Sequence, residues 1–377
     1  MNILALNAGS ESLKYKLFRM PEMGSDAAEE VLLGGSEDHS AGGIVEASEK
    51  VLKACAKKGV DAIGHRVVQG GTLFREPTRV SPDLLKGLHE LRDLDPTHNP
   101  TETAMIEAGS RLLPGVPAFA LFDTSFHRTL PEVAWRYALP RDLSDRWHLR
   151  RYGFHGLSHQ YVAEALLRLL KRKPEGTRLI VCHLGNGASV CALKDGRSVD
   201  TSMGMTPLEG LVMGTRSGDV DPGLLMYLLR TAHMTAKAVD DALNLRSGLL
   251  GLSGKSADVR QLVILSDKGS EDARLALQIF AYRVRKYIGA YAAVLGGVDA
   301  VAFTGGIGEH SAQMRGRICE GLSFLGIHLD QAANDRVGTE EACISAAHAS
   351  TQIWVIPTDE EREMARQVWK LLGGKPL

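Results

Sequence analysis

A short apolar strand followed by a Gly/Ser-rich turn and a second strand occurs twice in the chain, and this repeat limits the fold most. The first copy is LALNAGSESLKYKLF, residues 4–18, and the second is LIVCHLGNGASV, residues 179–190. A third Gly-rich turn, GGIGE at residues 305–309, also follows a buried strand pattern. Glycine lets a backbone approach an anion closely, although a plain hairpin explains any one turn alone. Together the three turns predict a duplicated, phosphate-binding α/β unit.

The length and charge of the chain narrow its class. With 377 residues it is long enough for two domains, and 44 basic against 45 acidic residues give a net charge of −1. This balance gives no electrostatic reason to expect a nucleic-acid or membrane-surface partner. The five cysteines are scattered without a CxxC pair, and no segment resembles a signal peptide or a membrane span. We therefore expect a cytoplasmic protein.

Strand and helix patterns alternate along the rest of the chain. Buried strands are predicted within DAIGHRVV, VPAFALF and VDAVAFT, and the Asp195-Gly196 pair predicts a hairpin after the second copy of the repeat. Residues 22–43 are small, acidic and Gly-rich, which favours a surface excursion. The last helix is predicted to begin at a capping box formed by Thr358 and Glu361. Helices are also predicted at residues 44–58, 101–112 and 272–295.

Several charged or titratable side chains lie next to glycines or at strand ends. Arg66 precedes Gly70-Gly71, Arg216 lies in TRSGD, and His155 lies between glycines in YGFHG. A single arginine is more often a solvated charge or a structural ion pair, but two in Gly-rich loops suit the charge that spreads over a transferring phosphoryl group. Asp123 follows a buried strand, whereas Glu360 has the alternative role of stabilising a helix N-terminus.

These motifs together resemble the acetate kinases, within the acetokinase branch of the sugar kinase/Hsp70/actin superfamily. The matching segments run in order from residue 4 to residue 366. They are ALNAGSESLKYKL, GHRVVQGG, THNP, LFDTSFHRTLP, RRYGFHGLSHQYV, HLGNGASV, MGMTPLEGLVMGTRSGDVDPG, FTGGIGEH and PTDEEREMAR.

The resemblance implies a fold and a division into domains. The fold is α/β, with two duplicated ribonuclease H-like domains of the actin/Hsp70/sugar kinase type and an interdomain cleft. Residues 1–128 and a returning helix at 360–377 would form the first domain. Residues 129–359 would form the second, which binds the nucleotide and carries the contacts of a homodimer.

The resemblance also implies roles for individual residues. Asn7 and Glu360 would position Mg²⁺, with Mn²⁺ as an alternative. The catalytic group would be Asp123, Arg66, Arg216 and His155. The acetate site would comprise Arg66, Val68, Thr97, Phe154 and Pro207. The residues around ATP or ADP would be Ser10, Ser12, Lys14, His183, Leu184, Gly185, Asn186, Gly187, Asp258, Val259, Arg260, Gly305, Gly306, Ile307 and Gly308.

Elementary chemistry agrees with a carboxylate as phosphoryl acceptor. A carboxylic acid similar to Asp or Glu is ionised at neutral pH, so it needs no general base to become a nucleophile. Arginines and Mg²⁺ that bring two anions together should therefore dominate, with direct in-line transfer of the γ-phosphoryl group giving acetyl phosphate and ADP. Propionate or butyrate as acceptor, pyrophosphate as donor, a sugar or glycerol kinase, and a non-enzymatic ATP-switched clamp remain alternatives.

The chain departs from the usual family pattern at the acyl site. The family usually has His and Glu where this chain has Gln69 and Thr72, and leucine where it has Thr97. Gln69 keeps a hydrogen-bonding group but cannot titrate near neutral pH.

We predict that Thr97 makes the acyl pocket more polar and shifts the preference between acetate and propionate. The ratio of kcat/KM for acetate to kcat/KM for propionate should therefore differ between the protein and its Thr97→Leu variant. Equal ratios for the two proteins would contradict this prediction.

Overall fold

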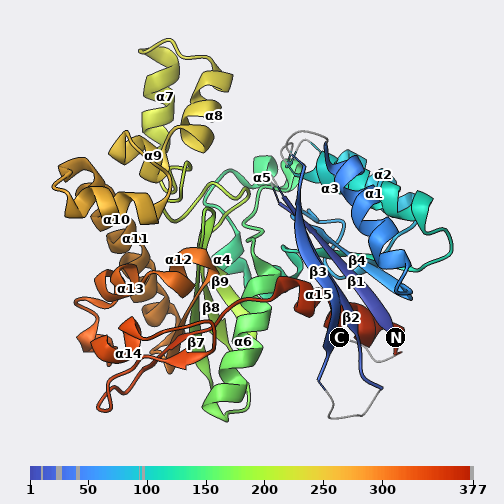
Figure 1. Ribbon diagram of the computed structural model, residues 1–377. Helices are drawn as coiled ribbons and strands as arrows, with labels where there is room; N and C mark the ends of the chain where they lie inside the picture. The colour runs from blue at the N-terminus through green and yellow to red at the C-terminus, as the bar shows by residue number, and fades with distance from the viewer. Residues whose placement is uncertain (10–11, 23–27, 40–42, 93, 96–97, 374–377) are drawn as a thin grey trace. The chain divides into compact units, whose positions relative to one another are not determined.

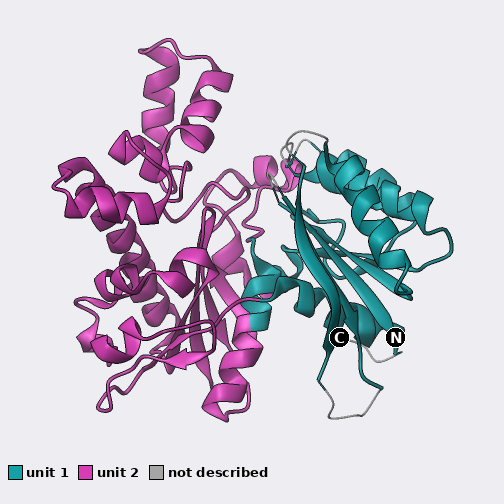
Figure 2. Ribbon diagram, viewed as in Figure 1, with its two compact units in different colours: residues 1–128, 154–161, 359–377 teal, residues 129–153, 162–358 magenta. Residues whose placement is uncertain are grey.

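The computed structural model describes residues 1–9, 12–22, 28–39, 43–92, 94–95 and 98–373, and these form two compact units. Figure 2 colours them separately. The first unit comprises residues 1–128, 154–161 and 359–377, and the second comprises 129–153 and 162–358. Each unit contains one six-stranded sheet. No described helix is both long enough and apolar enough to span a bilayer.

The sheet of the first unit has the strand order β3-β2-β1-β4-β6-β5. β1, β2 and β3 form an antiparallel meander, whereas β4 and β6 run parallel to β1. The elements of this unit are β1 (Asn2–Ala8), β2 (Ser12–Arg19), β3 (Glu30–Asp38), α1 (Gly43–Ala56), β4 (Ala62–Val67), β5 (Thr78–Arg79), α2 (Pro82–Glu90), α3 (Asn99–Leu112), β6 (Ala118–Phe122), the 3₁₀ helix η1 (Ser125–Thr129), which ends one residue into the second unit, and α15 (Glu360–Leu372).

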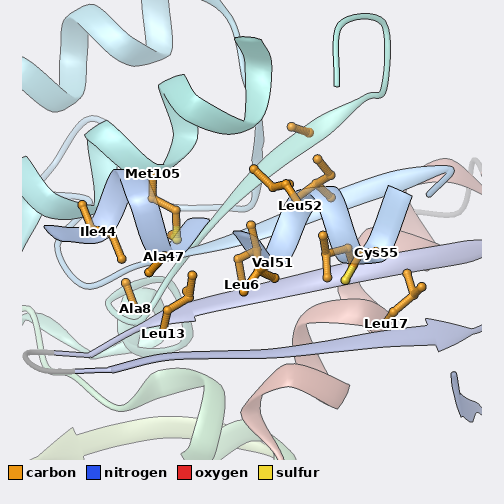
Figure 3. Close-up of a cluster of buried hydrophobic side chains, with 13 residues drawn as sticks. Leu6, Ala8, Leu13, Leu17, Ile44, Ala47, Val51, Leu52, Cys55 and Met105 are labelled. Atoms are coloured by element: carbon orange, nitrogen blue, oxygen red, sulfur yellow. The ribbon is translucent and has the colours of Figure 1, made fainter. Parts of the chain in front are cut away.

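The alternation of side chains along β1 explains why this sheet is covered on both faces. Leu4 and Leu6 point to a core shared with α1 and with Met105 of α3, drawn in Figure 3. Ile3 and Ala5 point to the other face, where they pack against α15. Because successive strand residues face opposite ways, a continuous apolar strand needs helices on both sides.

The second unit repeats the arrangement with different strands. Its sheet has the order β11-β12-β10-β7-β8-β9, and the long helix α11 packs on β7 and β8. The elements, labelled in Figure 1 where there is room, are α4 (Glu132–Trp135), α5 (Arg141–Trp147), α6 (Gly156–Leu170, whose first residues belong to the first unit), β7 (Arg178–Leu184), β8 (Ala188–Lys194), β9 (Arg197–Thr201), α7 (Pro222–Arg230), α8 (Ala236–Leu245), α9 (Gly248–Ser253), α10 (Val259–Asp267), α11 (Glu271–Leu295), β10 (Ala300–Thr304), α12 (Gly305–His310), α13 (Ala312–Cys319), the 3₁₀ helix η2 (Ser323–Leu325), α14 (Gln331–Asp335), β11 (Ala342–Cys343) and β12 (Gln352–Val355).

The two sheets correspond strand by strand. The antiparallel meander β1-β2-β3 matches β7-β8-β9, the parallel strands β4 and β6 match β10 and β12, and each sheet ends in a two-residue antiparallel edge strand. The Asp195-Gly196 hairpin joins β8 to β9, with both residues in the left-handed region at φ 55° and 73°. The duplicated α/β fold predicted from the repeat is therefore confirmed.

Three local predictions need correction. The excursion at residues 22–43 contains strand β3, which pairs with β2, although its sequence is too polar to look like a strand. The glycines of GGIGE form the first turn of α12 and not a separate loop. Asp359, and not Thr358, caps α15 by accepting the amide hydrogen of Arg362.

Candidate active site

Three polar side chains of the first unit lie at the carboxyl ends of neighbouring parallel strands. Asn7 is near the end of β1, Arg66 is the second-to-last residue of β4, and Asp123 directly follows β6. Asn7 continues the face of Ile3 and Ala5, which packs against α15. Strand period and strand order together therefore place these three groups side by side.

Arg66 connects the three groups. Its Nε and Nη2 donate to Oδ2 of Asp123 at 3.2 and 2.7 Å, and its Nη1 donates to Oδ1 of Asn7 at 3.0 Å. The exposed fraction of the side chain is 13% for Arg66 and 1% for Asp123. Burial opposes the charge of Arg66, but the carboxylates of Asp123 and Glu360 outweigh it and raise the pKa of the guanidinium above its usual value.

The N-terminus of α15 supplies acidic groups to Asn7. Nδ2 of Asn7 donates to Oε2 of Glu360 at 2.9 Å and to Oε1 of Glu361 at 2.8 Å. Lys16 of β2 holds this end of the helix through Asp359, at 2.8 Å, and Glu361, at 3.6 Å. Carboxylates are also favoured at a helix N-terminus by the helix dipole.

The segment 154–156 lies against Asp123. A Cβ added to Gly156 would fall 2.0 Å from the backbone oxygen of Asp123, so only glycine allows this approach. The backbone oxygen of Phe154 is bound by Nε2 of His127 at 3.0 Å, and His155 has a left-handed backbone with φ 57°. The structure thus packs Gly156 against the backbone of Asp123, and Phe154 and His155 directly precede this contact.

The chain that follows β4 is fixed by several hydrogen bonds. The amide of Val68 donates to Oε2 of Glu102 at 3.0 Å, and the amide of Gly70 donates to Oγ1 of Thr124 at 3.2 Å. Gln69 is fully buried, and its Oε1 accepts the amide of Gly71 at 2.9 Å. The side chain of Gln69 therefore helps to fix the turn at Gly71.

In the second unit, the turn between β7 and β8 meets the loop that leads to Arg216. The turn closes through the amide of Gly185 and the oxygen of Gly187 at 3.0 Å, and the oxygen of Asn186 accepts the amide of Gly214 at 3.0 Å. A Cβ on Gly214 would lie 2.0 Å from Oδ1 of Asn186. His183 pairs in register with Thr304 of β10. The predicted second phosphate turn is therefore a packed junction.

Arg216 and Pro207 are direct neighbours. Nη1 of Arg216 donates to the backbone oxygen of Pro207 at 3.2 Å, and the backbone oxygen of Arg216 accepts the amide of Met213 at 3.1 Å. Gly248, at the start of α9, approaches the backbone of this loop so closely that a Cβ would lie 2.3 Å from the oxygen of Met213. The loop carrying Arg216 is thus fixed by backbone contacts on both sides.

The predicted residues at the start of α12 pack against the same turn. Gly305 has φ 76°, and a Cβ there would lie 2.8 Å from the oxygen of Leu184. Oε1 of Glu309 accepts the amide of Gly305 at 2.8 Å, Oγ1 of Thr304 at 3.2 Å and the amide of Thr358 at 3.1 Å. Glu309 therefore joins the start of α12 to the segment that precedes α15.

Other predicted nucleotide residues have looser surroundings. Asp258 caps α10 and pairs with the exposed Arg260, whose hydrogen bonds lower the pKa of Asp258. Val259 is buried beside them, whereas Lys14 is exposed on β2 opposite Asn7. Ser12 begins β2. Ser10 and Thr97 lie outside the described residues.

The sequence profile of the acetokinase family matches residues 28–366. The chain belongs to the acetokinase family. It is 46% identical over 399 residues to the acetate kinase of Heliobacterium modesticaldum, and the match covers 99% of this chain and 100% of that protein. Enzymes of this family are kinases, so the chain is a phosphotransferase, as its sequence predicts.

Two solved structures are similar over nearly the whole chain. The acetate kinase of Porphyromonas gingivalis matches with a TM-score of 0.89 and 37% identity, covering 98% of this chain and 99% of that one. A propionate kinase from Francisella tularensis matches with a TM-score of 0.87 and 35% identity, covering 97% and 98%. The family and the fold are therefore shown by both sequence and structure.

The contacts of four residues of this acetokinase were not predicted from the sequence, although Glu361 was assigned to a capping box. Glu361 contacts Asn7, and Lys16 contacts Asp359 at the start of α15. Glu102 accepts the amide hydrogen of Val68, and Glu309 accepts that of Gly305. The alternation of Lys14 and Lys16 on one face of β2 was a signal for Lys16. Glu361 and Glu102 contact residues distant in the sequence, and Glu309 also accepts the amide hydrogen of the distant Thr358.

We predict that Glu309 stabilises the start of α12. Glu309→Ala should lower the free energy of unfolding in urea by about 1–3 kcal/mol, because up to three part-buried donors lose their acceptor. Glu309→Gln should lower the free energy of unfolding less, since its amide oxygen still accepts hydrogen bonds. His310→Ala, at the neighbouring exposed position, should change the free energy of unfolding little. A wild-type unfolding midpoint for Glu309→Ala would contradict the prediction.

Proposed function

We propose that the protein is an acetate kinase that catalyses the reversible, Mg²⁺-dependent transfer of the γ-phosphoryl group of ATP to acetate. The products are acetyl phosphate and ADP, and the transfer is direct and in-line. The proposal combines family membership with the chemistry of Arg66 and the two residues that hold it, Asp123 and Asn7. The acetate kinase names of its relatives support the choice of acceptor.

The observation that carries the proposal is the way Arg66 is held. A guanidinium has five N–H donors. Among the described residues, Arg66 makes three hydrogen bonds, to Asp123 and Asn7, so donors remain for an anion. Oδ1 of Asp123 is buried and has no hydrogen-bond partner in the described part of the chain. A rigidly held cation with spare donors suits an acetate or phosphoryl oxygen.

The acceptor chemistry requires positioning more than proton transfer. Acetate is ionised at neutral pH, so its oxygen already has the electron pair that attacks phosphorus. Arg66 would neutralise this anion, while Val68 and Phe154 of the same unit are buried apolar groups suited to its methyl end. His155 would hydrogen-bond the transferring group, and Asp123 would keep Arg66 aligned.

Asn7 and Glu360 of the first unit fit a Mg²⁺ site with few protein ligands. Carboxylate and amide oxygens are the hard ligands that Mg²⁺ takes, and in kinases it usually keeps phosphate oxygens and water as its other ligands. Asn7 and Glu360 provide one amide and one carboxylate. No cluster of three or more acidic, His or Cys side chains able to hold a metal occurs among the described residues. When bound, Mg²⁺ would neutralise charge on the phosphates.

We assign the nucleotide to residues of the second unit. The turn at 185–187 and the start of α12 carry glycines whose backbone N–H groups suit phosphate oxygens. Arg216 would be the second cation of the reaction, after Arg66, and would stabilise negative charge on the transferring group. Asp258–Arg260 and Gly306-Ile307 would flank the adenine, and Gly306 has open space beside its Cα.

Propionate is the second candidate acceptor. A structural neighbour of nearly the same similarity is a propionate kinase, and Thr97 departs from the family pattern at the acyl site.

A homodimer formed through the second unit is the assembly we propose. Exposed apolar side chains on α7 and at the end of α8, Leu224, Met226, Tyr227 and Leu245, support that choice.

The function is tested by trapping the acyl phosphate with hydroxylamine. Protein incubated with acetate, ATP and Mg²⁺ should form acetohydroxamate, with no phosphorylation of glycerol or hexoses under the same conditions. Propionate should react with a lower kcat/KM than acetate. Failure to form a hydroxamate from acetate, propionate or butyrate would refute the carboxylate-kinase assignment.

We predict that Glu360 contributes to metal binding. Glu360→Gln should raise the Mg²⁺ concentration needed for half-maximal activity roughly tenfold or more, because a carboxylate ligand becomes a neutral amide. The exposed Glu76→Gln variant is the charge-matched control and should keep the wild-type requirement. An unchanged Mg²⁺ requirement in Glu360→Gln would remove Glu360 from the metal site.

A further inference from the structure

A buried carboxyl group lies behind Arg66, and no step of the proposed reaction uses it. Glu102 is in the first turn of α3, and only 1% of it is exposed. Its Oε2 accepts the amide hydrogen of Val68, two residues after Arg66, at 3.0 Å. Its Oε1 is buried and has no hydrogen-bond partner in the described ranges.

Charged groups from three directions act on Glu102. They are Arg66 on β4, Asp123 after β6, and Asp95 before α3. Arg66 is already bound to Asp123, and Asp95 accepts hydrogen bonds from the amide and ring of His98. Glu102 therefore lacks a dedicated cation.

The other titratable groups around α3 are exposed or remain uncharged. His65 of β4 lies against Gly109, farther along α3, and burial lowers its pKa to about 3. The ion pairs of α3 with α1 and α2, Arg111–Glu49 and Glu107–His89, are exposed. None of these groups compensates a negative charge on Glu102.

We propose that Glu102 is a positioning residue whose protonation state sets the affinity for the anionic acceptor. With its proton, it holds the Val68 amide and adds no charge behind Arg66. Without its proton, it places a second buried carboxylate near Arg66, which then attracts acetate less strongly. This inference rests on the proposed function.

The direction of the ionisation follows from the surroundings. Burial raises the pKa of Glu102 to about 8; the charge of Arg66 and the Val68 hydrogen bond oppose this rise, whereas Asp95 and Asp123 add to it. Glu102 is therefore neutral at neutral pH and ionises in mildly alkaline solution. The kcat/KM for acetate should fall as the pH passes through this region, while the KM for ATP changes less.

The test compares pH profiles of kcat/KM for acetate in three proteins. In the wild type, kcat/KM for acetate should fall about tenfold above pH 8, which is the order of magnitude expected for one added charge in a partly buried site. Glu102→Gln, which keeps an acceptor for Val68 but cannot ionise, should lose this decline. Glu107→Gln, an exposed position on the same helix, should keep it. Identical alkaline declines in Glu102→Gln and the wild type would overturn the proposal.

A second variant and a second measurement separate this inference from the assigned activity. Glu102→Met should show lower kcat/KM for acetate at every pH, also without the alkaline decline. In the wild type, the unfolded chain ionises Glu102 above pH 4.5 and the folded one only near pH 8, so stability is lost across that interval. The melting temperature of Glu102→Gln should rise relative to wild type across it. A constant difference in melting temperature would overturn the proposal even if no kinase activity were found.

Discussion

The buried ion pair between Arg66 and Asp123 is the interaction on which the rest of the first unit depends. Removing two charges from water costs several kcal/mol each, and their attraction offsets this only with good geometry and further hydrogen bonds. Here Asn7 supplies such a bond to Arg66. Three parallel strands, each with its helical cover, are needed to place the three groups together. A fold that pays this cost usually uses the pair for binding or chemistry.

The second unit has the same strand order but a different chemical character at the corresponding strand ends. Where the first unit places Asn7 and Arg66, the second has the 185–187 turn and the glycines of α12. The contacts at these strand ends include backbone amides and carbonyls of the turn and the carboxylate of Glu309. One architecture thus supplies a cluster of charged side chains in one copy and a backbone surface in the other. In the proposed reaction, these serve the acceptor with its metal and the nucleotide, respectively.

Much of the fold could be predicted from the sequence because its strands are buried on both faces and therefore read as apolar runs. β1, β4, β6, β7 and β10 all have this pattern. β3 was missed because it is an edge strand with polar and glycine residues. The helical start at Gly305 was missed because glycine usually indicates a loop, whereas here close packing against Leu184 requires it.

The candidate site was predictable only in part. Residues within recognisable motifs, such as Arg66 and Asp123, were identified, and the structure places them together with Asn7. Their roles in catalysis stay predictions. The contacts of Glu102, Glu309 and Glu361 lack a local signal, because a carboxylate on a helix surface looks the same whether it faces solvent or a buried amide. Only the packing of α3, α12 and α15 distinguishes the two cases.

The most direct test of the account is a double-mutant cycle on the ion pair. The variants are Arg66→Gln, Asp123→Asn and the two combined, with kcat/KM for acetate as the measured quantity. If Asp123 acts by holding Arg66, the combined variant should be no slower than Arg66→Gln alone. Losses that multiply in the combined variant would show that the two residues act independently and would contradict the account.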